Sequence, residues 1–565
     1  MILMTYRKLR TENPDRRRWN PALIMIVLIL FPVILNAQQE EVRVVKPYSP
    51  TLSGAQKIQL LPGMNEEIDF TPPEFEYHLY PKRYDSQFKA QPIRAARMVK
   101  MPLKKLYKSQ VTLGIGNYFT PLAELNLSQL RSRKGTFGLN IRHHSMNGKV
   151  KLDNDLKAEA GFNENSLELY GDRFMKNAVL EYDLGASYNS YVHYGVDPEL
   201  DTVLDRKDAM EPYFLAEAGL DLHSMNADSF HFDYNAGLDY YYFSHRFEEA
   251  EHGAGIDFDF HKKLRVIDIA GELGGAWYGH YPDWDSIVGN HTMFWANPYI
   301  GKSAPEWQFT AGVNIYGEVR EQFLTLHFYP RASFEFNIVR DVIVPYFGVD
   351  GYLESNNYRS IVEENPYVAP TLSVLPTSHK LIGYAGLKGR FSDVFVWNLK
   401  GSYSIIDNQY FFVNDTSTML KNQFNVVYDD ITLLKLQGEF SIRPSDAWKV
   451  FLKGNYYNYT LVREEHPWNK PAFDLSLQAR YNMSDKILIN IGVYTIGSRY
   501  YENFSSSADA TLPLTIDGNL GIEYRYTKLL SFWVRFNNVA AQRYFLYAQY
   551  PSYRFRGMIG LTYAL

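Results

Sequence analysis

The stretch that decides the fold is Leu434–Arg443, LKLQGEFSIR, in which apolar and polar side chains alternate. Successive side chains of a β-strand point to opposite faces, so one face of this segment is apolar and the other is polar and charged. Short turns at Pro444–Ala447 and Ser484–Lys486 lead into further segments with the same alternation. The C-terminal part of the chain therefore predicts a series of antiparallel hairpins.

Apolar and polar side chains also alternate in the strands of a soluble β-sandwich. Strand length and the composition of each face must therefore distinguish a sandwich from a membrane barrel. Sandwich strands need about five or six residues, whereas the segments here run to roughly 10 to 15, near the length of a tilted transmembrane strand. Their polar faces carry full charges, and aromatic residues make up 16% of the chain, with 44 Tyr. This combination favours an all-β fold, a transmembrane antiparallel β-barrel wrapped by outer-membrane lipid; a secreted or periplasmic all-β protein is the alternative.

Strand-like segments follow one another from Gln110 onward, and about 22 of them are expected. Gln423–Asp429 is counted as a strand of its own, separate from the one that starts at Leu434. The longer gaps are assigned to loops at the cell exterior: 193–210, 353–376, 460–470 and 499–511. The predicted barrel domain spans 109–565.

The N-terminus has the layout of a signal peptide, since Arg16–Arg18 precede the apolar run Ala22–Leu35. That run is too short to span the roughly 30 Å of hydrocarbon comfortably, and cleavage is expected after Ala37, which makes 1–37 the signal peptide. A retained anchor helix is the alternative. The chain has no Cys, so neither a lipid-attachment thiol nor a disulfide framework is expected.

Residues 38–108 differ from the rest, because frequent prolines interrupt any regular pattern and the second half is strongly basic. We interpret them as an extended, Pro-rich periplasmic segment. It is expected to lie in an acidic lumen, dock on a periplasmic or outer-membrane protein, meet anionic headgroups, or serve as a solvated linker. The net charge of -5 argues against a nucleic-acid partner.

The C-terminus reads Arg535–Val539 (RFNNV), then Gln542–Tyr544 (QRY), and ends at Gly560–Leu565 (GLTYAL). These residues resemble the last hairpin of TonB-dependent receptors, whose barrels have about 22 strands. The resemblance implies a Gram-negative outer-membrane location in the cell envelope and insertion by the barrel-insertion machinery. Leu565 departs from the usual terminal aromatic residue, so this recognition is expected to rest on Tyr563 and its neighbours.

The N-terminal sequence Val44–Ser53 (VVKPYSPTLS), with Leu113–Tyr118 and Leu122–Leu125, resembles receptor-like outer-membrane proteins of Bacteroidota. Receptors of this class carry a globular plug that residues 38–108 are too few to form, so a plugless barrel is expected. Four residues resemble a TonB box, the strand that pairs with an energy-coupling protein: Glu41, Val42, Val44 and Val45.

No catalytic motif is present, and no enzyme, cofactor or metal site is predicted. His143 and His144 are neighbours on an alternating strand, so they should face opposite sides and not share a metal. The acidic loop between Asp197 and Asp208 has oxygen ligands suited to calcium, but a solvated loop is favoured.

The leading function is a receptor-like barrel for transport that passes or binds a solute or polymer across the outer membrane. Charged residues on the polar face are expected to line the lumen and set what it tolerates. The competing function is a structural or assembly subunit that scaffolds a larger complex in protein secretion or barrel insertion. The lumen candidates are Lys435, Glu439, Arg443, Lys449, Lys453, Arg480, Glu523, Arg525 and Arg535.

Overall fold

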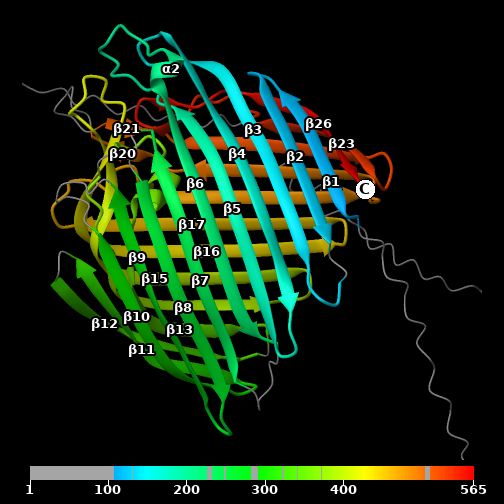
Figure 1. Ribbon diagram of the computed structural model, residues 1–565, viewed down its shortest axis with the longest axis vertical. Coiled ribbons are helices and arrows are strands. Elements are labelled where there is room, and N and C mark those ends of the chain that lie inside the picture. Colours follow the sequence, from blue (N-terminus) through cyan, green and yellow to red (C-terminus); the bar gives the residue numbers. More distant parts are fainter. Residues whose placement is uncertain are drawn as a thin grey trace, which may run out of the picture. The chain divides into compact units, whose positions relative to one another are not determined.

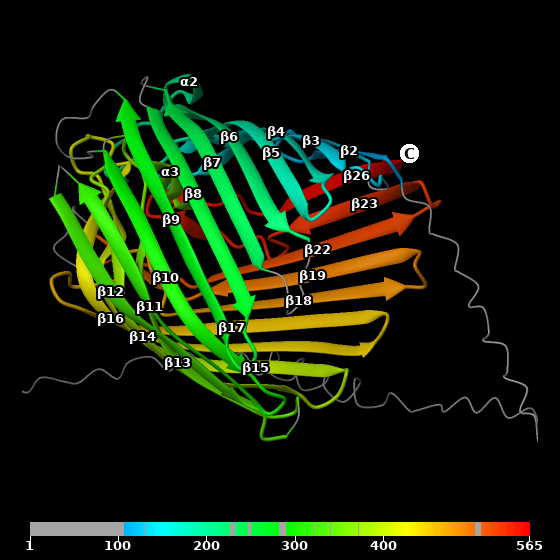
Figure 2. The same ribbon diagram turned by 60° about the horizontal axis from the view of Figure 1, so that its bottom comes forward.

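A closed ring of antiparallel strands forms the body of the protein (Figures 1 and 2). The computed structural model describes residues 107–565 except 130–131, 226–231, 247–249, 282–289, 321–322, 340, 371 and 503–509. The ring contains 22 strands and closes because β1 (Ser109–Gly116) pairs both with β2 (Thr120–Gln129) and with β26 (Arg556–Ala564). The predicted all-β barrel of about 22 strands is confirmed. The expected signal peptide, the basic segment and the TonB-box-like residues lie outside the described residues.

Each remaining strand pairs with its neighbours in the sequence around the ring. Among the described residues no helix is long and apolar enough to cross a membrane. The other strands of the ring are β3 (Phe137–Lys151), β4 (Lys157–Phe174), β5 (Ala178–Val192), β6 (Met210–Ser224), β7 (Asp233–His245), β8 (Ala250–Lys263), β9 (Asp268–Tyr281), β10 (His291–Ser303), β11 (Trp307–Arg320), β12 (Phe323–Phe336), β13 (Val344–Glu354), β14 (Thr377–Arg390), β15 (Phe395–Asn414), β16 (Phe424–Ser445), β17 (Trp448–Leu461), β18 (Phe473–Met483), β19 (Ile487–Ile496), β22 (Thr515–Arg525) and β23 (Leu530–Asn537).

The alternation in the sequence separates the two faces of the ring. Leu436 on β16 and Ile559 on β26 belong to the apolar set and are 49% and 64% exposed on the outside. In the polar set of β16, Gln437 lies opposite Asn455 of β17 and Glu439 lies opposite Lys453. The apolar set faces outward, and charged side chains line the bore.

One predicted strand boundary is wrong. Gln423–Asp429 is not a separate strand, because β16 runs without a break from Phe424 to Ser445 along β15. Asp429, which suggests a turn in the sequence, is fully buried, and its carboxylate accepts the backbone N–H groups of 462–464 at 3.0 Å. The acidic residue anchors a neighbouring loop and does not end the strand.

The connections at the two ends of the barrel differ. Both described termini lie at the end with short turns, where the Lys108 N–H donates to the Leu565 carbonyl at 2.7 Å. The long connections lie at the other end and contain α2 (Arg206–Ala209), α3 (Tyr358–Glu364), the β20–β21 pair (Arg499–Tyr501, Ala510–Leu512) and the β24–β25 pair (Phe545–Tyr547, Tyr550–Pro551).

The connection between β13 and β14, residues 355–376, does not extend outward as expected. It folds back between strands on different sides of the ring, and α3 lies within that ring (Figure 2). Ile361 and Leu372 are fully buried, and Val368 is 1% exposed. We call residues 355–376 the seal segment. Its burial corrects the expectation of an external loop, because apolar residues in this connection pack against the inner wall.

Candidate functional site

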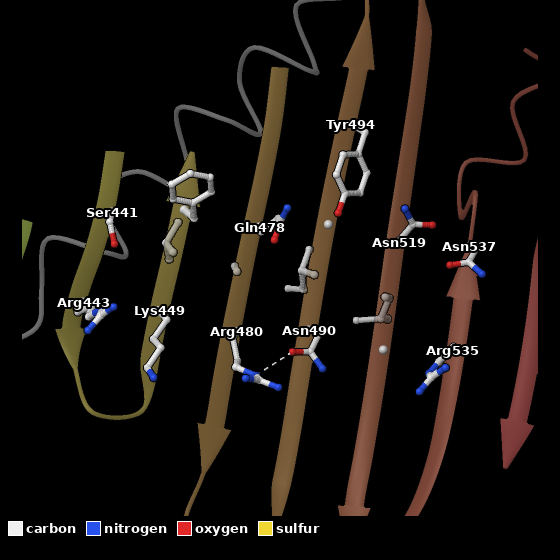
Figure 3. A pocket seen from close by; sticks show the side chains of 17 residues that line it. Ser441, Arg443, Lys449, Gln478, Arg480, Asn490, Tyr494, Asn519, Arg535 and Asn537 are labelled. Atoms are coloured by element: carbon white, nitrogen blue, oxygen red, sulfur yellow. Dashed lines mark hydrogen bonds between the residues drawn. The ribbon is translucent and has the colours of Figure 1, made fainter. Parts of the chain in front are cut away.

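A polar hollow of about 560 Å³ lies on the inner wall across β16–β19, β22 and β23 (Figure 3). Four of the predicted lumen residues meet in it: Arg443, Lys449, Arg480 and Arg535. Amide and hydroxyl groups fill the spaces between them. We call this site the basic hollow, and its polar lining also includes Ser441, Gln478, Asn490, Tyr494, Asn519 and Asn537.

Strand register explains why these residues meet. Lys449 on β17 lies directly opposite Arg480 on β18, and Arg480 lies opposite Asn490 on β19. The same row continues through Gly521 on β22 to Arg535 on β23. Residues that are far apart in the sequence therefore form one line across the sheet.

Within the described part of the chain, the cations of the basic hollow have no acidic partner. Its lining contains no Asp or Glu, and within the part of the chain that the structure describes no ion pair involves Arg443, Lys449, Arg480 or Arg535. Arg480 Nε donates to Asn490 Oδ1 at 3.1 Å, and the Arg535 guanidinium lies 4.3 Å from the centre of the Trp533 ring. The hollow therefore concentrates positive charge.

The other predicted lumen residues are placed differently. Lys453 Nζ lies 3.0 Å from Glu439 Oε1, and Arg525 Nε lies 3.6 Å from Glu523 Oε1, so these cations have acidic partners. Lys435 lies over the Tyr457 ring, with Nζ 5.3 Å from its centre. The nine candidates thus divide into a cluster without acidic partners, two ion pairs and one cation–π contact.

A second charged surface was not predicted from the sequence. It occupies β5–β8, where Ala-Gly-Leu-Asp at 218–221 and 236–239 and Ala-Gly-Ile-Asp at 254–257 follow the same pattern. In the sheet, Gly237 lies opposite Asp221 on one side and Asp257 on the other, and Gly255 lies opposite Asp239. These pairs form a checkerboard of carboxylates and glycines, which we call the acidic wall.

The glycines of the acidic wall make room for the carboxylates. A Cβ atom at Gly219, Gly237 or Gly255 would collide with an Asp side chain of the neighbouring strand. The carboxylates surround a hollow of about 210 Å³, into which Arg359 of α3 reaches; its Nη2 donates to Glu217 Oε2 at 2.9 Å. The repeated tetrapeptide was visible in the sequence, but the register that brings the repeats together was not.

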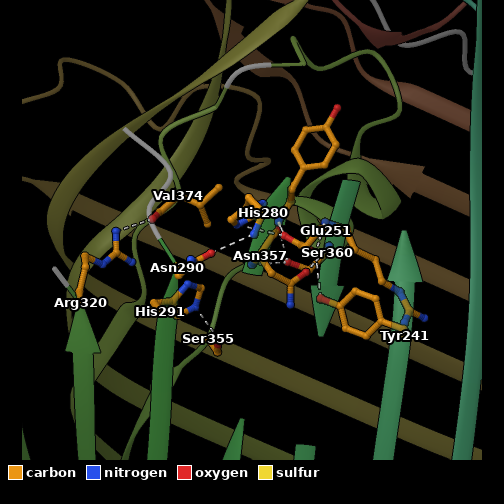
Figure 4. A network of polar contacts seen from close by, with 12 residues as sticks. Tyr241, Glu251, His280, Asn290, His291, Arg320, Ser355, Asn357, Ser360 and Val374 are labelled. Atoms are coloured by element: carbon orange, nitrogen blue, oxygen red, sulfur yellow. Dashed lines mark hydrogen bonds and ion pairs between the residues drawn. The ribbon is translucent and has the colours of Figure 1, made fainter. Parts of the chain in front are cut away.

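The seal segment is tethered to the inner wall through Glu251 of β8 (Figure 4). This side chain is 1% exposed, and its carboxylate accepts the backbone N–H groups of Tyr358 at 2.8 Å and Arg359 at 3.2 Å. The Tyr241 hydroxyl donates to it at 2.8 Å, and His280 Nε2 lies 3.6 Å away. A carboxylate at the first N–H groups of α3 satisfies donors that the helix itself leaves unpaired.

Further tethers hold the seal segment from other sides of the ring. The Pro366 carbonyl accepts from Tyr213 Oη and from His193 Nε2, both at 2.9 Å. Arg320 on β11 donates to the Val374 carbonyl at 2.9 Å. On β16, the Phe424 N–H donates to the Tyr367 carbonyl at 2.9 Å. A segment held from β6, β8, β11 and β16 crosses the bore.

An aromatic layer packs against the seal segment. The rings of Tyr367 and Tyr550 stack with their centres 3.8 Å apart, and Tyr194 packs edge-on against Tyr550 at 5.0 Å. Burial lowers the pKa of His193 to about 4, against the opposing influence of Glu211. His193 therefore stays neutral at pH 7 and does not add a buried charge to the layer.

The remaining candidates have structural roles. His143 bonds to Asn165 Oδ1 at 2.7 Å, whereas His144 lies 3.8 Å from Glu164, in agreement with the expected opposite facing. Asp197 in the acidic loop pairs with Lys421 at 2.8 Å, and Asp205 caps α2. Among the described residues no cluster of His, Asp and Glu has the arrangement of a metal site.

Solved structures that share the fold include receptors and transporters. The FrpB iron transporter from Neisseria meningitidis matches with a TM-score of 0.64 and 9% identity, over 82% of each chain. The copper transporter OprC matches with a TM-score of 0.61 and 10% identity, also over 82% of each chain. A mutant of the ferric enterobactin receptor PfeA from Pseudomonas aeruginosa gives 0.59 and 11%, over 82% of this chain and 81% of that one.

At these identities the likeness establishes the barrel fold alone. No protein-family model matches the chain. No curated protein matches its sequence.

Proposed function

We propose that the protein is a receptor-type barrel of the Gram-negative outer membrane that binds a polar solute or polymer in a closed bore and passes it across the membrane. The supporting observation is the bore itself, in which the basic hollow and the acidic wall line a barrel that the seal segment crosses at the loop end. Charged side chains on the inner wall are stable beside water, and apolar side chains on the outer face are stable in contact with lipid. Export by the signal peptide 1–37 and the absence of catalysis are part of this proposal.

A closed bore favours a receptor over an open pore. An empty barrel of this size would leak solutes, and the tethers of the seal segment prevent this at the mouth. Passage then requires the seal segment to move, and a ligand or partner can shift it only by binding its two arrangements with different affinity. The TonB-box-like residues Glu41–Val45 are the proposed point of energy coupling.

The scaffold function is retained as the second candidate, because a sealed barrel also suits a subunit that transports nothing. Purification in mild detergent separates the two. A receptor is expected to purify as a single chain that conducts once the seal segment is removed. A stoichiometric set of partners, together with a barrel that does not conduct after removal of the seal segment, would favour the scaffold.

The charged walls should control which ions pass through the opened bore. In a variant whose seal segment is replaced by a short Gly-Ser linker, changing Asp221, Asp239 and Asp257 to Asn should shift selectivity toward anions, because cation attraction at the acidic wall is removed. The measurement is the reversal potential in a KCl gradient across a planar bilayer. The matched control is Asp485→Asn in the β18–β19 turn, which should leave the potential unchanged; an unchanged potential in the triple variant would contradict passage along this wall.

A further inference from the structure

Among the described residues, none of the four cations gathered in the basic hollow has an acidic partner. Several other bore cations have an adjacent carboxylate: Lys388 Nζ lies 2.7 Å from Glu335, and Arg331 Nη1 lies 2.9 Å from Glu272. In the basic hollow, Lys449 and Arg480 lie directly opposite each other on paired strands. Like charges in that position destabilise a sheet.

Glycine residues in the lining leave space in the hollow next to the row that contains Lys449 and Arg480. Gly521 lies between Asn490 and Arg535, and a Cβ atom there would touch only Asn490, at 3.8 Å. Gly492 lies in the next row, opposite Gln478 and Asn519. Side chains at these two positions would partly fill the hollow. Their absence leaves donor groups around an accessible depression.

We propose that the basic hollow binds a ligand carrying several phosphate or carboxylate groups. Arginine guanidinium groups form paired hydrogen bonds with such oxyanions, and the interleaved amides supply further donors. Strands lie about 4.8 Å apart, so the row from β16 to β23 extends over roughly 24 Å, which is enough for several anionic groups. The volume of about 560 Å³ is also well above that of a single inorganic ion.

The location sets the side from which this ligand enters. Arg443 lies two positions before the end of β16 at Ser445, and Lys449 is the second residue of β17. The hollow is therefore near the end with short turns and the termini, away from the seal segment. The proposed ligand would therefore enter from the compartment on that side. The inference goes beyond the proposed function, since the site exists in a transporter and in a scaffold alike.

Titration of the full chain in detergent at low salt tests this site. One arm uses tripolyphosphate as the soluble anion, and the other uses micelles containing phosphatidylglycerol, with phosphatidylcholine as the neutral comparison. Saturable binding in either arm supports the site, and the arm in which it occurs identifies a free anion or a lipid headgroup as the source. Absence of binding in both arms would overturn it.

The variants Arg480→Gln and Lys449→Gln should each weaken binding about tenfold, the effect expected for the loss of one charge-assisted hydrogen bond. The matched control is Lys435→Gln, which removes one positive charge from the same wall outside the hollow and should change affinity less than about twofold. An equal loss of affinity in the control would show that the anion responds to the overall positive charge of the wall and not to a specific site. If a variant does not fold, the wild-type protein still tests the proposal, because binding of the anion to the folded state must raise its melting temperature. An unchanged melting temperature would contradict the site.

Discussion

Replacing the seal segment with a short Gly-Ser linker should turn a barrel with little conductance into one with large, steady conductance, a rise on the order of tenfold or more. The physical reason is that residues 355–376 and the aromatic layer around Tyr367 and Tyr550 occupy the mouth of a ring of 22 strands. Without them the charged bore would be continuous with the solvent. Single-channel recording in planar bilayers measures the change.

The control for this deletion places the same linker in the β9–β10 connection, 282–289, at the same mouth. That variant should stay closed, since the tethers at Glu251, Pro366 and Val374 all remain. Removing residues 38–106 in parallel separates the effect of the N-terminal segment from that of the seal. A folded deletion variant with the low conductance of the parent, or a parent that already conducts as strongly, would contradict closure by residues 355–376.

Arginine at Leu436 or Leu477 should lower the free energy of unfolding by about 2–4 kcal/mol where the position is near the middle of the bilayer. Both residues belong to the outward apolar set, and Leu477 pairs with Leu452 and Val493 on its neighbouring strands. A charge there would have to enter hydrocarbon. Denaturant titration of the barrel folded into phospholipid vesicles measures the cost.

The adjacent residues of the same strands provide matched controls. Gln437→Arg and Ser476→Arg place the same side chain in the bore, where Gln437 already contacts Glu439 and Ser476 lies opposite Lys453. The expected cost is below about 1 kcal/mol, since the charge stays hydrated. Equal costs at the outward and inward positions would be incompatible with this assignment of the two faces.

Much of the barrel could be predicted because the alternation of apolar and polar residues is a local property of the sequence. Alternation over Leu434–Arg443 and its repeats specifies strand, face and approximate length without any knowledge of partners. The same rule failed at Asp429, where a buried acidic residue anchors a loop that begins some thirty positions later. Such a role depends on tertiary contacts, which alternation does not encode.

The seal segment and the assembly of the charged walls were less predictable. Ile361, Val368 and Leu372 make residues 355–376 more apolar than an external loop requires, which was the available signal. Their partners, among them Glu251 and Tyr550, are far away in the sequence. The four cations of the basic hollow were among the predicted lumen residues, but only strand register shows that they meet and which amides lie between them.

The central claim is that water fills a charged bore while the outer face of the ring contacts lipid. The chain contains no Cys, so single cysteines along β18 report on each face without background. In vesicles with the reagent on both sides of the bilayer, a membrane-impermeant maleimide should label Ser476→Cys, Gln478→Cys and Arg480→Cys and leave Leu475→Cys, Leu477→Cys and Ala479→Cys protected. Uniform labelling, or the reverse alternation, would contradict this account.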